Sequence, residues 1–155
     1  MNPLAFNEVA AFCQSLKKQN KKIVFTNGCF DILHVGHVTY LQQARELGDF
    51  LFLGLNSDSS VRKLKGEQRP VQNEKDRSRI LLQLKSVDAL CIFPEDTPLD
   101  LIKQVKPDVL VKGGDWDVNQ IVGKEFVESY GGVCKNLPFV SGYSTSTILE
   151  KIKKL

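Results

Sequence analysis

Five short apolar runs, separated by stretches with helical character, constrain the fold of this chain more than any other feature. The runs are rich in Val, Ile, Leu and Phe, as is typical of strands that are covered on both faces of a sheet. They lie at Lys22–Thr26, Phe50–Asn56, Ala89–Phe93, Val109–Lys112 and Val133–Leu137. Alternating strands and helices predict a parallel sheet with helices on both faces. With 155 residues, we expect one domain over residues 1–155.

Helical patterns occupy much of the chain between the apolar runs. The expected helices are an amphipathic one at Phe6–Lys18, one at Val38–Leu47 ending at Gly48, one from the cap Asn73 to about Leu84, and a final one with Thr147 and Glu150 at capping-box spacing. The stretch Lys63–Asn73 has no such pattern and is predicted to be a polar loop. An irregular loop inside a small domain is more often functional than idle.

Bulk composition excludes several classes of protein. A hydrophobic fraction of 42% and a charged fraction of 25% argue against disorder, and a net charge of +3 does not suggest a surface that coats nucleic acid. We see no signal peptide and no apolar stretch long enough to span a membrane. The four cysteines form no CxxC pair, and Cys91 and Cys134 lie in apolar runs where buried thiols are expected. A reducing, cytoplasmic setting is therefore expected.

Both histidines of the chain lie in the tetrapeptide His34-Val35-Gly36-His37, shortly after the first predicted strand. Imidazoles donate hydrogen bonds to phosphate, and the amides at a helix start attract anions. Gly36 would let a phosphate approach the backbone. The alternatives are two ordinary surface or core histidines, or a metal site. The metal site lacks a third ligand nearby, so we predict a polyphosphate site and no metal ligands.

Three other segments carry residues suited to phosphate or sugar binding. Lys65 and Arg69 lie in the polar loop, where they either close over phosphates or remain solvated. Arg77 lies in the first turn of a predicted helix. The helix dipole disfavours a cation there unless the cation has an anionic partner. Val111-Lys112-Gly113-Gly114-Asp115-Trp116 follows a strand and forms either a ligand-binding turn or a turn with a packed Trp. Gly142-Tyr143-Ser144-Thr145-Ser146-Thr147 opens the last helix, where hydroxyls bind phosphate, cap the helix, or do both. The chain has neither GxGxxG nor a complete P-loop.

These motifs resemble a known group of enzymes. Thr26-Asn27-Gly28-Cys29-Phe30-Asp31-Ile32-Leu33-His34-Val35-Gly36-His37 is similar to the signature of the HxGH nucleotidyltransferases, the cytidylyltransferase-like superfamily. Arg69-Pro70-Val71, Asp76-Arg77, Phe93-Pro94-Glu95-Asp96-Thr97-Pro98 and Pro107–Trp116 resemble the adenylyltransferases of ADP-heptose synthesis. The resemblance covers about residues 20–155 and implies an α/β fold, a Rossmann-like three-layer sandwich with a five-stranded parallel sheet.

The resemblance also implies a reaction and a role for each site residue. ATP and D-glycero-β-D-manno-heptose 1-phosphate would give ADP-heptose and pyrophosphate, with Mg²⁺ accompanying ATP. His34, His37 and Lys65 would be catalytic. Nucleotide binding would involve Asn27, Gly28, Cys29, Phe30, Gly36, Lys112, Gly113, Ser144 and Thr145. Binding of the sugar phosphate would involve Asp31, Arg69, Arg77, Asp115 and Trp116.

Other readings stay open from the sequence. A CTP-dependent enzyme acting on a polyol phosphate such as glycerol 3-phosphate is the main alternative, although related cytidylyltransferases carry an Arg where this chain has Phe139. A relative of class I aminoacyl-tRNA synthetases and a non-catalytic nucleotide sensor are the others. In many bacteria the heptose enzyme is fused to a sugar kinase, so we expect a separate kinase as pathway partner. We expect a homo-oligomer, with no nucleic-acid or membrane partner.

Overall fold

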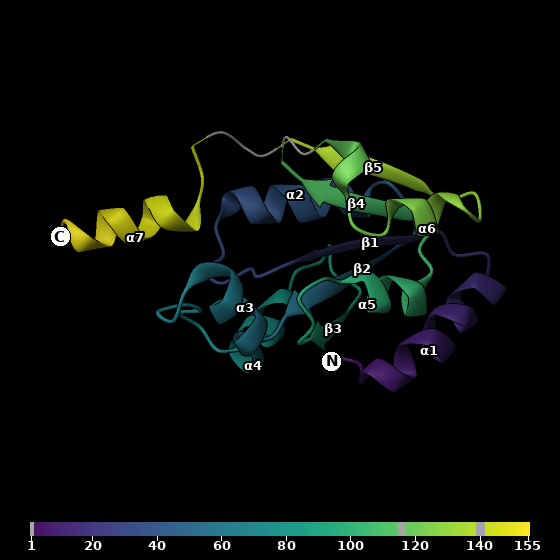
Figure 1. The fold of residues 1–155 in the computed structure, drawn as a ribbon, viewed down its shortest axis with the longest axis horizontal. Helices are drawn as coiled ribbons and strands as arrows, with labels where there is room; N and C mark the ends of the chain where they lie inside the picture. The colour runs from purple at the N-terminus through teal and green to yellow at the C-terminus, as the bar shows by residue number, and fades with distance from the viewer. Residues whose placement is uncertain (1, 115–116, 139–141) are drawn as a thin grey trace.

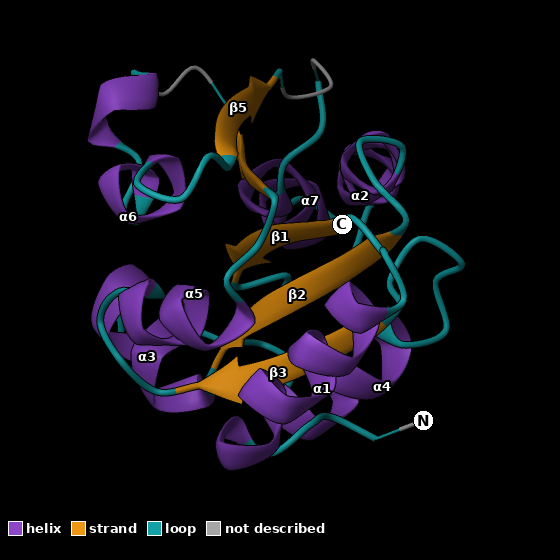
Figure 2. Cartoon of the chain, turned by 90° about the vertical axis from the view of Figure 1, so that its right-hand side faces the viewer, coloured by secondary structure: helices purple, strands orange, loops and turns teal. Residues whose placement is uncertain are grey.

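One five-stranded parallel sheet, covered by helices on both faces, forms the centre of the computed structural model, which describes residues 2–114, 117–138 and 142–155 (Figure 1, Figure 2). The strands are β1 (Ile23–Gly28), β2 (Phe50–Asn56), β3 (Ala89–Phe93), β4 (Val109–Gly113) and β5 (Val133–Leu137). Their order across the sheet is β3-β2-β1-β4-β5. The expected Rossmann-like α/β architecture is confirmed. Three predicted strands have the expected bounds, whereas β1 and β4 extend further into the glycine-containing segments that follow them.

The helices differ more from the sequence-based expectations. They are α1 (Phe6–Lys18), α2 (Val35–Arg45), α3 (Asp58–Lys65), α4 (Glu74–Leu81), α5 (Leu99–Val105), α6 (Lys124–Glu128) and α7 (Thr145–Lys153), with a 3₁₀ turn at Val118–Gln120. The bounds of α1 are as predicted, and Asn73 caps α4 through its side chain. Helix α2 begins three residues earlier than predicted. The capping box at Thr147 and Glu150 is wrong, because Ser144 is the residue that caps α7.

Side chains alternate between the two faces of the sheet and build two apolar cores. Phe25 and Phe52 project toward one face, where α1, α5 and α6 supply Val9, Leu101 and Val127. The opposite core joins residues of α2 and α4 with the alternate strand positions; its members include Val24, Tyr40, Leu41, Ala44, Leu51, Leu53 and Leu81. Burial on both faces explains why the strands appear in the sequence as nearly continuous apolar runs.

The strand order places a binding crevice at a definite edge of the sheet. β1 pairs with β2 on one side and with β4 on the other, so the direction in which the chain adds strands reverses at β1. In open α/β sheets, ligands bind beyond the carboxyl ends of the strands at this reversal. The residues that follow β1 include the histidine motif, and β4 ends at Lys112 and Gly113. The fold therefore brings two of the predicted segments to the same edge.

Helix α7 stands apart from the other helices and extends from one end of the molecule (Figure 1). None of its residues is buried, and Ile152 is 56% exposed. The helix begins beside the histidine motif, so its first turn is the part that matters for the site. Among the helices of the described residues, none is long and apolar enough to cross a membrane.

Gly48 offers a test of the packing between α2 and β1. A Cβ at this position would lie 2.7 Å from the carbonyl oxygen of Lys22 and 2.8 Å from a methyl group of Val24. The Lys22 carbonyl accepts hydrogen bonds from the amides of Asp49 and Phe50 and cannot move away freely. Gly48→Ala should therefore lower the free energy of unfolding in urea by about 1–3 kcal/mol. The exposed control Gln42→Ala should change it by less than about 0.5 kcal/mol; equal effects would contradict the packing argument.

Candidate active site

The two histidines form a stacked pair at the start of α2. His34 is the N-cap residue and His37 lies one turn later, with ring centroids 3.8 Å apart and planes inclined by 19°. The His34 side chain makes no capping hydrogen bond, and the Nδ1 atoms of both rings are buried without a hydrogen-bond partner among the described residues. Buried polar atoms are normally satisfied. The pair therefore presents hydrogen-bonding capacity that the protein leaves unused.

Both imidazoles are held in their neutral form near pH 7. Burial lowers the pKa of His34 below its ordinary value. Burial, reinforced by the charge of neighbouring His34, lowers the pKa of His37 to about 4, although the Ile32 carbonyl acts in the opposite direction. An anion placed against the rings would favour their protonated forms.

Two glycines make room for the rings around this pair. A Cβ on Gly36 would lie 3.0 Å from Nδ1 of His34 and 3.1 Å from Cβ of Tyr143, so Gly36 admits these two side chains. A Cβ on Gly28 would lie 2.8 Å from the Phe30 ring. Phe30 is 6% exposed and sets its ring edge-on to His37 at 5.2 Å between centroids. Phe30 thus supports His37, and its predicted contact with nucleotide is revised to a packing role.

The start of α7 lies against the histidine motif. The ring centroid of Tyr143 is 6.4 Å from that of His34, and the Thr145 hydroxyl donates to the Ile32 carbonyl at 3.4 Å. The Ser144 hydroxyl accepts from the Thr147 amide at 3.0 Å and caps the helix. Capping leaves the other first-turn amides available to an anion, as at other helix N-termini. The motif of residues 34–37 and the segment of residues 143–145, far apart in sequence, therefore share one site. Tyr143 was not singled out from the sequence.

Positive charge gathers around Cys29 at the same edge. Burial raises the pKa of the Cys29 thiol, whereas Lys65, Arg77 and Arg69 act to lower it. Burial lowers the pKa of Lys112, an effect to which the nearby charge of Lys65 adds. Lys65 is exposed at the end of α3, and Lys112 is half-buried at the end of β4. These two lysines come from separate elements and lie close enough for the charge of Lys65 to act on Lys112.

Asp31 and Arg69 do not face the crevice as free binding groups. Their side chains pair at 2.6 Å, and Asp31 is 2% exposed. The carboxylate also accepts hydrogen bonds from the amides of Val71 and Gln72. With its oxygens occupied, Asp31 has a structural role, and its contact with the sugar phosphate stays a prediction. Arg69 commits its Nε atom to Asp31, and its contact with the sugar phosphate also stays a prediction.

Arg77 is a structural residue of this fold, and its binding of the sugar phosphate stays a prediction. It is 1% exposed, and its guanidinium donates to the carbonyls of Gln72, Cys29 and Asn56 at 2.9, 2.6 and 2.9 Å. Its remaining nitrogen bonds the Asp58 carboxylate at 2.7 Å. The sequence correctly indicated that a cation in the first turn of α4 needs an anionic partner. That partner is Asp58 in α3, which sequence reasoning missed.

The remaining predicted residues fall into two groups. Asn27 lies near the end of β1, and Gly113 ends β4, so both are at the carboxyl edge of the sheet. Asp115 and Trp116 lie outside the described residues, as does Phe139. Cys91 is buried as expected, whereas Cys134 is only half-buried, and all four cysteines are free thiols.

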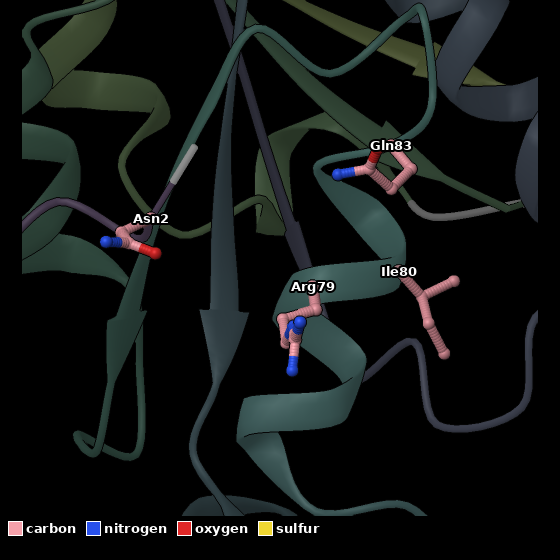
Figure 3. A pocket seen from close by; sticks show the side chains of 4 residues that line it. All are labelled: Asn2, Arg79, Ile80 and Gln83. Atoms are coloured by element: carbon pink, nitrogen blue, oxygen red, sulfur yellow. The ribbon is translucent and has the colours of Figure 1, made fainter.

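A hollow of about 560 Å³ lies elsewhere on the surface, lined by Asn2, Arg79, Ile80 and Gln83 (Figure 3). It contains no residue of the histidine motif or of the strand ends that form the crevice. Ile80 is 41% exposed, and no buried polar atom without a partner lines the hollow. This hollow is therefore separate from the crevice at the carboxyl edge of the sheet.

Comparison with known proteins agrees with this geometry. Residues 25–151 match the family described as cytidylyltransferase-like. The chain belongs to the cytidylyltransferase-like family. The matched region contains the histidine motif, both lysines and the first turn of α7. The expectation of a nucleotidyltransferase is thus confirmed at the level of the family.

Several bacterial relatives are similar over most of this chain. The bifunctional protein HldE of Geobacter sulfurreducens is 55% identical over 94% of the chain, and that of Geotalea uraniireducens is 57% identical over 94%. HldE of Aliarcobacter butzleri is 52% identical over 96%. In each case the match covers 30% of the relative. The chain therefore spans less than a third of the length of these relatives.

Solved structures show the same fold. The lipopolysaccharide core biosynthesis protein of Thermoplasma volcanium superposes with a TM-score of 0.65 at 29% identity, covering 80% of this chain and 99% of that one. Pantoate-beta-alanine ligase of Francisella tularensis, solved with a β,γ-ATP ligand and β-alanine, gives 0.64 at 18% identity, covering 100% and 77%. The second likeness shows the fold alone.

Proton titration of the two histidines provides a direct test of the site. NMR of the free protein should show His37 titrating near pH 4 and His34 below about 6.5, in line with the two lowered pKa values. Because the unfolded chain takes up these protons near pH 6.5, it holds more protons than the folded chain between these limits. The free energy of unfolding should therefore rise with pH across that interval, and less steeply in His37→Gln. A His37 pKa near 6.5 would contradict the buried geometry.

Proposed function

We propose that this chain transfers the adenylyl group of ATP to D-glycero-β-D-manno-heptose 1-phosphate and releases pyrophosphate. The observation that supports the transfer chemistry is the stacked histidine pair at the start of α2. The buried Nδ1 atoms of both rings have no hydrogen-bond partner among the described residues. The charge of Lys65 acts on Lys112 at the end of β4, and the first turn of α7 contacts the histidine motif. The similarity to HldE proteins and to a lipopolysaccharide core biosynthesis protein supports a sugar phosphate as acceptor.

The reaction needs no covalent intermediate with the protein. An oxygen of the sugar phosphate forms a bond to the α-phosphorus of ATP, and the bond from that phosphorus to the oxygen that bridges to the β-phosphorus breaks. Catalysis then consists of positioning the two phosphates and stabilising the charge that develops. His34, His37 and the amides at the start of α7 are suited to hold the triphosphate. Lys65 and Lys112 are suited to bridge it to the incoming phosphate.

Magnesium would enter with ATP. Among the described residues, no group of three or more His, Cys, Asp or Glu converges to form a metal site. Mg²⁺ commonly retains waters and binds through substrate phosphates, and the donor set of the crevice, which is cationic and imidazole-based, fits the phosphates and not the bare ion. The bound ion would neutralise phosphate charge, while the chain's own residues orient the nucleotide.

The acceptor would come from an enzyme that produces a sugar 1-phosphate, and a kinase that phosphorylates the anomeric carbon is the partner we propose. Asp115 and Trp116 remain proposed contacts to the sugar, because they follow Gly113, the last residue of β4, closely in the sequence.

A panel of nucleotides and acceptors tests the proposal, read by pyrophosphate release. ATP with D-glycero-β-D-manno-heptose 1-phosphate should exceed CTP with glycerol 3-phosphate by at least about 10²-fold in kcat/KM, because unpaired polar groups penalise the wrong ligand. Asp115→Ala should reduce this preference and leave ATP binding nearly intact. Preference for CTP and glycerol 3-phosphate would overturn the heptose assignment but not the transfer chemistry.

The histidine pair is tested separately. His34→Ala and His37→Ala should each lower kcat by about 10²-fold or more, comparable to the loss of a charge-stabilising donor. Both variants should fold, since the rings lie at a ligand-facing helix start. Gln42→Ala, an exposed change on the same helix, should leave kcat unaltered. Normal turnover in either histidine variant would place the chemistry elsewhere.

A further inference from the structure

The exposed segment between α3 and α4 is held by one buried carboxylate. Residues 66–72, called here the 66–72 loop, connect α3 to the cap of α4. Asp31, which lies in the turn after β1, accepts from the amides of Val71 at 2.8 Å and Gln72 at 2.9 Å, and from Arg69 Nε at 2.6 Å. Hydrogen bonds to an ionised partner are about twice as strong as neutral ones. The far end of the loop is therefore fastened to the turn that precedes the histidine motif.

Arg77 fastens the start of α3, the helix that leads into this loop. Its NH2 group bonds Asp58 in the first turn of α3, and Glu74 accepts the Asp58 amide at 2.7 Å. The residue Gln72 joins the two anchors, because its amide donates to Asp31 while its carbonyl accepts from Arg77. Residues 58–72 thus form a span that is tied at both ends to buried charged side chains.

Apolar packing contributes little to the middle of this span. Leu64 and Val71 are 54% and 57% exposed, and residues 62–68 are all exposed. Lys65 lies in this stretch, and its charge acts on both Cys29 and Lys112 across the crevice. Buried Ser60 and Val61 hold the first half of α3. Beyond Val61 no side chain is buried up to Gln68, so the position of Lys65 at the helix end depends on the helix itself and on the Asp31 anchor of the loop that follows.

We propose that Asp31 is a positioning residue that acts through Lys65. By fastening the 66–72 loop to the turn after β1, the Asp31 carboxylate keeps the Lys65 ammonium group at the crevice, facing the phosphates. This inference rests on the proposed function for the role of Lys65, but the fastening itself is independent of which substrate binds.

Kinetic coupling between the two residues tests the proposal. Asp31→Asn keeps the shape of the side chain but removes its charge and turns an NH₂ group toward Arg69 or an amide. In single-turnover reactions with saturating ATP and heptose 1-phosphate, Asp31→Asn should slow the chemical step by about tenfold or more, because small misplacements of a positioned group are costly. In a Lys65→Ala background, the same change should have an effect of less than about twofold, since residues that act as a unit are non-additive.

Limited trypsinolysis provides a readout that does not depend on activity. Cleavage after Lys65, followed by mass spectrometry, should be faster in Asp31→Asn than in the native protein, because the loop opens more often. If Asp31→Asn does not fold, Arg69→Gln removes one of the anchoring contacts and should show the same pattern with smaller amplitude. Lys63→Ala is the matched control. Among the described residues this exposed lysine of α3 pairs with exposed Asp96 at 3.0 Å, and its removal should leave the chemical step unchanged.

The outcomes are distinguishable. Independent, multiplying rate losses in Asp31→Asn and Lys65→Ala would overturn the proposal, as would an unchanged cleavage rate after Lys65. Absence of turnover by the native protein with every nucleotide and acceptor would refute the proposed function, and faster cleavage in Asp31→Asn would then still support the fastening. Unchanged chemistry in Lys65→Ala would refute the role of Lys65 and the positioning role with it.

Discussion

The buried guanidinium of Arg77 is the interaction on which the architecture of the crevice depends. It reaches carbonyls after β1, at the end of β2 and before α4, and the carboxylate of Asp58 in α3. A buried charge is tolerable only when it is paired and its hydrogen bonds are satisfied. Arg77 meets this condition because it donates hydrogen bonds to backbone carbonyls at and beyond the ends of the strands. The same hydrogen bonds hold three loops in a fixed arrangement.

The same logic explains why the site can be both rigid and open. The amides of the Asp31 anchor and the carbonyls around Arg77 are bonded within the protein, whereas the histidine Nδ1 atoms have no partner among the described residues. Polar groups that build the framework are satisfied by one another, and the two histidine atoms are left for a ligand. This division separates residues that are close in sequence, since Asp31 and His34 lie in one turn and have different roles.

Much of the fold was predictable because buried parallel strands leave a strong local signal. Of the three strands with the expected bounds, β2 and β3 are nearly continuous apolar runs, whereas β5 contains Lys135 and Asn136 and is only partly buried. Helix α1 has a clear amphipathic pattern. Helix α3 was missed because its sequence, with three basic residues near its end, reads as a polar loop, and α5 and α6 are only seven and five residues long. The start of α2 was misplaced because His34 caps the helix without a side-chain hydrogen bond.

The location of the site followed from the motif after β1, but the roles of Asp31, Arg69 and Arg77 did not. The sequence shows which charged residues lie near a motif, but the fold decides their partners. Asp31 and Arg69 pair across 38 residues, and Arg77 and Asp58 pair across 19.

The Thr145 hydroxyl contacts the Ile32 carbonyl, although the two residues are 113 positions apart in the sequence. Ile32 lies two residues before the histidine motif. A chain made from its N-terminus exposes His34 and His37 long before the segment at residues 143–145 emerges from the ribosome. The sheet and both apolar cores are complete by the end of β5, so nothing in their folding waits for that segment. The sheet and its cores therefore do not need the segment at residues 143–145, whereas the crevice is complete only when that segment packs against the histidine motif.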